Sequence, residues 1–103
     1  MTEQSARAGY AWAAMCIGYA EIPYDDIKQK LVNGDYFSVR IKDDSEKDTV
    51  LTGLIGFADI SNKRVMIAKP YRHNSRLWAH EYLHYLPKVK NHPDSLFERC
   101  NLR

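Results

Sequence analysis

The spacing of apolar and polar residues predicts four helices. Residues 5–19 are apolar on nearly every side of a helix, which is typical of a helix buried among several neighbours. Residues 23–33 begin with a proline and two aspartates, which suit the first turn of a helix, and end at an Asn-Gly pair. Residues 74–86 form the clearest helix, with an Asn-Ser pair able to cap its start and a proline directly after its end. Residues 96–100 form a last short helix after a His-Pro-Asp-Ser segment.

Between the second and third of these helices, apolar residues recur about every second position. This spacing predicts strands at residues 36–41, 49–59 and 64–68. Two glycines within 49–59 indicate a bulge or bend. Short turns between neighbouring strands favour antiparallel pairing. The predicted fold class is therefore α+β, with a small antiparallel three-stranded sheet packed with helices. A length of 103 residues allows one domain, spanning residues 1–103.

The compartment is predicted from the N-terminal apolar run and the cysteines. Residues 8–20 are apolar but too few to span a bilayer, and their Tyr and Trp content favours a buried helix over a signal-peptide core. Cys16 and Cys100 are too few for a disulfide framework and form no C-x-x-C motif. We expect both to be reduced, buried thiols of a cytoplasmic protein, the alternative being a bridge between the two ends of the chain.

Charge is distributed unevenly along the chain. Residues 1–62 carry a net charge of −4 and residues 63–103 carry +6, which combine to +2. A basic C-terminal half with Trp78, Tyr71 and Tyr82 interleaved is a candidate surface for nucleic acid or for an enzyme that binds it, the alternative being a solvated face. The chain contains no P-loop, no G-x-G-x-x-G, no G-x-S-x-G and no paired-Cys finger, which excludes the common nucleotide, hydrolase and finger classes.

The motif that carries chemistry is His80-Glu81-Tyr82-Leu83-His84, an H-E-x-x-H on the third predicted helix. Four residues turn a helix by about 400°, so the two imidazoles lie nearly one above the other. That separation suits one Zn²⁺ at about 2.1 Å from two ring nitrogens. Glu81 lies beside the metal, where it accepts a proton from metal-bound water as general base. The alternative is an amphipathic helix with two ordinary histidines.

A third ligand is expected from the segment that follows the helix. His92 comes eight residues after His84, beyond the break at Pro87, as a ligand from a neighbouring element requires. Asp94 and Glu98 are the alternative oxygen ligands.

Two segments resemble known zinc peptidases. Residues 56–86 resemble the core of minimal zincin metallopeptidases, in which a hairpin and a strand lead into the H-E-x-x-H helix. Residues 92–100, HPDSLFERC, are similar to the ending of SprT-like proteases, although Pro93 stands where that family has glycine. The resemblance implies zinc bound by His80, His84 and His92, Glu81 as general base, and Phe97 and Cys100 as packing residues. Small stand-alone zincins of this kind are common in phages and mobile elements.

The resemblance also implies a peptide or protein substrate. In zincins a peptide adds as an extra strand at the sheet edge beside the metal, and residues 65–69 are the candidate edge here, the alternative being an internal strand. Oxyanion stabilisation needs a donor near the zinc, and the candidates are Tyr71, Arg72 and His73 just before the helix.

Two other functions fit the same sequence features. Zinc with a fourth protein ligand, such as Asp94 or Cys100, is structural rather than catalytic, and another divalent metal such as Fe, Ni or Co fits the same histidines. A second alternative is a small, phage-type binding or inhibitor protein without enzymatic activity, whose contact with nucleic acid weakens with salt.

Overall fold

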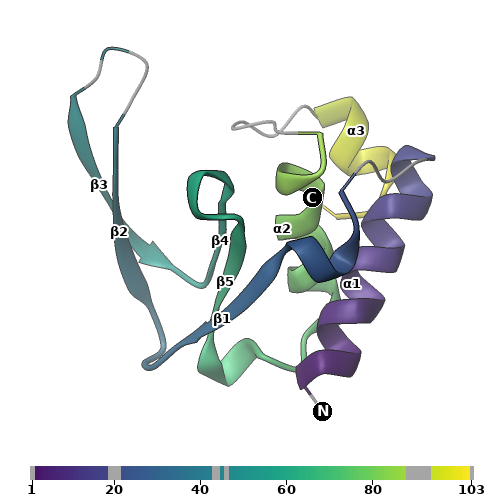
Figure 1. Ribbon diagram of the computed structural model, residues 1–103, viewed down its shortest axis with the longest axis horizontal. Helices are drawn as coiled ribbons and strands as arrows, with labels where there is room; N and C mark the ends of the chain where they lie inside the picture. The colour runs from purple at the N-terminus through teal and green to yellow at the C-terminus, as the bar shows by residue number, and fades with distance from the viewer. Residues whose placement is uncertain (1, 19–21, 43–44, 46, 88–93, 103) are drawn as a thin grey trace.

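The computed structural model describes the chain apart from residues 1, 19–21, 43–44, 46, 88–93 and 103. In the described part the fold class is α+β, as predicted, with three α-helices, a three-stranded sheet and a separate two-stranded hairpin. Figure 1 shows α2 between α1 and the sheet, with the hairpin projecting on the far side of the sheet. The elements in chain order are α1 (Thr2–Ile17), β1 (Lys28–Val32), β2 (Phe37–Lys42), β3 (Asp48–Leu54), β4 (Gly56–Asp59), β5 (Arg64–Ala68), α2 (Ser75–Tyr85) and α3 (Asp94–Arg99).

The three-stranded sheet has the order β1-β5-β4. It is mixed rather than wholly antiparallel, because β1 runs parallel to β5 whereas β4 runs antiparallel to it. Residues 65–68 of the central strand are all buried, as expected for a strand with neighbours on both sides. The prediction that residues 65–69 form the sheet edge open to a peptide is therefore wrong. Of the described strands, β4 forms the edge next to α2.

The predicted helix at residues 23–33 is replaced by a short 3-10 helix at Tyr24–Asp26 and by β1. Lys28 and Lys30 are exposed while the residues between and after them are partly buried, which is the alternation of a strand. The backbone N–H of Lys28 donates to the carbonyl oxygen of Lys63 at 2.8 Å, which joins the start of β1 to the start of β5. The proline and the acidic pair suit a 3-10 turn as well as a helix, and pairing with β5 then decides the conformation of the residues that follow.

The predicted strand at residues 49–59 divides into β3 and β4. Gly53 has a φ of +67°, in the left-handed region that favours glycine. Gly53 lies within β3 at an irregularity of the pairing with β2, and Leu54 beyond it still pairs with Phe37. The chain leaves the hairpin at Ile55, so β3 pairs antiparallel with β2 whereas β4 joins the main sheet. This break places the hairpin opposite α2.

Close contact between α1 and α2 depends on Gly9. A Cβ atom at Gly9 would lie 2.7 Å from the backbone nitrogen of Ala79 and would also collide with Trp78. Ala6 and Ala13, one turn to either side, are fully buried in the same interface. Small residues on one face of α1 therefore allow the two helix backbones to approach each other.

We expect Gly9→Ala to lower the free energy of unfolding by roughly 1–3 kcal/mol, despite the better helix propensity of alanine. The added methyl group meets backbone atoms that cannot move without separating the helices. Urea unfolding monitored by circular dichroism measures the change. Met15→Ala, on the same helix at an 83 % exposed position, should change stability by less than about 0.5 kcal/mol. Equal stability of Gly9→Ala and the wild type would contradict the close packing.

The cysteines form a disulfide between Cys16, near the end of α1, and Cys100, directly after α3, with a Cα–Cα distance of 5.6 Å. Trp12 adds a second link between these segments, because its Nε1–H donates to the carbonyl oxygen of Cys100 at 2.9 Å. The prediction of two reduced thiols is wrong, and the cytoplasmic location inferred from them loses its support. The segment that follows α3 lies beside the end of α1, which the separation of 84 residues conceals in the sequence, and this brings the two sulfur atoms together.

Within the described residues, no helix combines the length and the apolar character needed to cross a membrane.

Candidate metal and catalytic site

Helix α2 carries the H-E-x-x-H motif and begins at a defined cap. The side-chain Oδ1 of Asn74 accepts a hydrogen bond from the backbone N–H of Leu77 at 3.1 Å, so Asn74 is the N-cap. Trp78 fixes the approach to the helix, since its Nε1–H donates to the carbonyl oxygen of Arg72 at 2.9 Å. The motif therefore lies within a helix held at its start and packed against α1.

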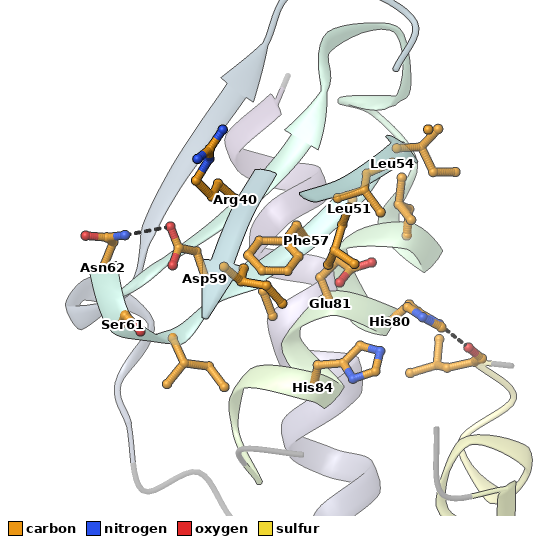
Figure 2. A pocket seen from close by; sticks show the side chains of 18 of the residues that line it. Arg40, Leu51, Leu54, Phe57, Asp59, Ser61, Asn62, His80, Glu81 and His84 are labelled. Atoms are coloured by element: carbon orange, nitrogen blue, oxygen red, sulfur yellow. Dashed lines mark hydrogen bonds between the residues drawn. The ribbon is translucent and has the colours of Figure 1, made fainter. Parts of the chain in front are cut away.

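The two histidines of the motif lie on neighbouring turns with their rings on the same side of α2 (Figure 2). The ring centroids of His80 and His84 are 5.1 Å apart. Phe97 of α3 is fully buried and packs against both rings, with centroid distances of 5.0 Å to His80 and 4.9 Å to His84. This confirms Phe97 as a packing residue beneath the histidines. The ring limits the space in which the two imidazoles can rotate.

A backbone hydrogen bond fixes the tautomer of His80. Its Nδ1 lies 2.5 Å from the carbonyl oxygen of Leu102. A carbonyl oxygen only accepts, so the proton of the neutral imidazole is on Nδ1 and the lone pair is on Nε2. Metal-binding histidines commonly donate their second ring nitrogen to such a carbonyl, which orients the ring and raises its basicity.

Glu81 is a carboxylic acid held in an apolar surrounding, with 7 % of its surface exposed. Burial raises its pKa from 4.5 to about 8. Gly56, the first residue of β4, provides the space for it, because a Cβ there would lie 2.7 Å from the Oε2 atom of Glu81. A neutral acid cannot accept a proton, so a role as general base requires the carboxylate form of Glu81, which a cation bound at the neighbouring histidines would favour.

Glu81 and the two histidines open on a cleft of about 1060 Å³ between α2, β4 and the β2–β3 hairpin. The apolar walls come from Leu51 and Leu54 of the hairpin and Phe57 of β4 (Figure 2). Leu77 of α2 adds to them. This size and an apolar lining with a few polar groups are typical of sites that bind small molecules or short peptide segments.

Cationic residues from two elements also line the cleft. They are Arg40 and Lys42 of β2 and Arg76 of α2. Sequence reasoning missed all three, and it missed Gly56 as well. The signal for Arg76 was present in its position one turn before His80, whereas Arg40 and Lys42 approach the motif only through the placement of the hairpin.

Several predicted site residues lie elsewhere or beyond the described residues. Tyr71 is partly buried against both hydrophobic clusters and His73 is exposed just before α2, and the residues that line the cleft include neither of them. His92 lies outside the described residues. Asp94 is the first residue of α3, and Glu98, on the same helix, is exposed.

The predicted aromatic surface for nucleic acid is wrong for two of its three residues. Trp78 and Tyr82 are fully buried, and their rings stack on each other with centroids 6.2 Å apart. A base cannot stack on a ring that lies in the core, so this support for the nucleic-acid alternative is lost.

The described donors fit part of a divalent metal site. His80 and His84 provide two imidazoles at helical spacing, with the tautomer of His80 suited to coordination. Among the residues that the structure describes, no group of three or more His, Cys, Asp or Glu side chains gathers closely enough to hold a metal ion. Cys100 is excluded as a fourth ligand because its sulfur is in the disulfide.

Comparison of the chain with models of protein families, with curated proteins and with solved structures finds no match.

Proposed function

We propose that the protein is a zinc-dependent peptidase. The observation that carries the proposal is the placement of the buried Glu81 carboxyl group at the cleft, on the same helix as two histidines whose rings lie side by side. His80, His84 and, as third ligand, His92 would hold the metal. When bound, zinc supplies a Lewis acid that polarises the scissile carbonyl group and increases the acidity of a water molecule.

The residues of the chain would bind the peptide and move one proton. A peptide in extended form would lie beside β4, the described sheet edge that borders the cleft, rather than beside β5. Glu81 would accept a proton from the attacking water and return it to the nitrogen of the leaving amine, so that each turnover restores the carboxylate. The apolar walls would exclude bulk water, and Arg76 would stabilise negative charge on the peptide oxygen.

The disulfide bears on where this activity would take place. Disulfides persist in oxidising compartments, whereas in the cytosol they are usually transient or catalytic. A cytoplasmic location is therefore not part of the proposal.

Metal content tests the proposal. Protein purified without added metal should contain about one zinc per chain, measured by atomic emission, because a site with three protein ligands retains zinc through purification. His84→Ala and His92→Ala should each lose this zinc, while His73→Ala, at an exposed position outside the cleft lining, should retain it.

Two results would contradict parts of the proposal. If the wild type is folded but contains no metal, the H-E-x-x-H segment is an ordinary helix without a metal site. A binding or inhibitor protein without enzymatic activity is then the better proposal. Tight zinc in His92→Ala would move the third ligand to Asp94 or Glu98.

A further inference from the structure

We propose that the turn at residues 100–102 positions His80. Its backbone carbonyl group at Leu102 orients the imidazole ring so that Nε2 is available to bind a metal. This inference rests on the proposed function, because it concerns the zinc site of that function. It adds a positioning role for residues outside the H-E-x-x-H helix.

The end of α3 has the hydrogen-bond pattern of a Schellman motif. The N–H of Leu102 donates to the carbonyl oxygen of Phe97 at 2.9 Å, and the N–H of Asn101 donates to that of Glu98 at 3.0 Å. Asn101 has a φ of +58°, the left-handed conformation that this motif requires at the residue after the cap. The reversal directs the chain back toward α2.

The reversal places the Leu102 carbonyl oxygen on the Nδ1 atom of His80, and Figure 2 shows this contact as a dashed line. The Leu102 side chain is 1 % exposed and belongs to the main core. The carbonyl is therefore held from two sides, by the backbone of the turn and by the packing of its own side chain.

The turn is also fixed to α1. The disulfide joins Cys100 to Cys16, and the Trp12 indole donates to the carbonyl oxygen of Cys100. Phe97 at the other side of the turn contacts both histidine rings. Residues 97–102 thus contact α1 on one side and the two histidines on the other.

Asn101 allows the backbone of the turn to be changed without touching the site. Its side chain is exposed, and its role is its left-handed conformation, which glycine adopts freely and a β-branched residue resists. Asn101→Val should displace the Leu102 carbonyl, whereas Asn101→Gly should leave it in place. Both variants keep the disulfide, and Asn101→Ala provides an intermediate case should Asn101→Val fail to fold.

The experiment has two readouts. Nitrogen-15 NMR of the metal-free protein reports which nitrogen of His80 carries the proton, and competition with a chromophoric chelator gives the zinc dissociation constant. We expect the Nδ1–H form in the wild type and in Asn101→Gly, and a mixture of tautomers in Asn101→Val. Zinc affinity should fall by roughly 10- to 100-fold in Asn101→Val, the usual effect of losing such a supporting hydrogen bond.

The outcomes separate this inference from the proposed function. Unchanged tautomer and unchanged zinc affinity in a folded Asn101→Val would overturn the positioning role while leaving the zinc site intact. Absence of zinc binding in the wild type would overturn the proposed function, and the tautomer measurement would still decide whether the turn orients His80.

Discussion

Replacing Glu81 by glutamine should strongly stabilise the metal-free protein at high pH and stabilise it by only about 1 kcal/mol near pH 5. The pKa of Glu81 is raised from 4.5 to about 8 because the carboxyl group is buried. Below about pH 4.5 the group is protonated in both the folded and the unfolded chain, and it contributes no difference. Between 4.5 and 8 the unfolded chain loses the proton while the folded chain keeps it, so stability falls as pH rises.

Above about pH 8 the folded protein contains a buried carboxylate, at a cost of about 3–5 kcal/mol relative to glutamine. Urea unfolding in the presence of a chelator, at pH 5 and pH 9, measures the difference between wild type and Glu81→Gln. The two histidines are present in both proteins, so their titration cancels in the comparison. Glu98→Gln, the same substitution at an exposed position, controls for the loss of one acidic group. An equal difference between wild type and Glu81→Gln at the two pH values would show that Glu81 is not buried as a neutral acid.

Removing the disulfide should cost about 4–5 kcal/mol, the loop-closure value for residues 84 apart in sequence. A domain of this size has a free energy of unfolding of roughly 5–15 kcal/mol, so losing the disulfide removes a large part of it. Cys16→Ser combined with Cys100→Ser should therefore unfold at a much lower urea concentration than the wild type.

Reductant provides the matched control for this variant. It should lower the midpoint of the wild type to that of the double variant and leave the double variant itself unchanged. If wild type and double variant unfold at the same urea concentration, the bridge between α1 and α3 does not contribute to the fold.

Local patterns in the sequence predicted the elements that they determine. The Asn cap, the apolar face and the following proline defined residues 74–86 closely, and the structure has α2 at Ser75–Tyr85 with Asn74 as its cap. Residues 64–68, a short apolar run between turns, form β5 with the same bounds. The H-E-x-x-H spacing correctly predicted that His80 and His84 lie side by side.

Contacts between distant segments account for what the sequence did not reveal. Residues 28–32 become a strand through pairing with β5, which local propensity does not encode. The pairing of Cys16 with Cys100 depends on how the segment after α3 lies against α1. The contact of the Leu102 carbonyl with His80 depends on a left-handed Asn101, and asparagine is only one of the residues that adopt this conformation.

The cleft could not be predicted from the sequence either. Its far wall is the β2–β3 hairpin, which lies there because the chain bends at Ile55 and continues into a different sheet. A single continuous strand at residues 49–59 would have given no such wall. The glycines signalled a bend, but the direction of the bend follows only from the pairing of β4 with β5.

Hydrolysis of a mixed peptide library by zinc-loaded wild type and zinc-loaded Glu81→Gln tests the central claim most directly. Mass spectrometry identifies the cleaved peptides, and zinc content measured on the same samples shows that both proteins carry equal metal. We predict cleavage by the wild type and a rate roughly 10²- to 10⁴-fold lower for Glu81→Gln, the usual contribution of a general base. Cleavage at the same rate by both proteins, or none by a wild type with a full complement of zinc, would contradict a peptidase in which Glu81 moves the proton.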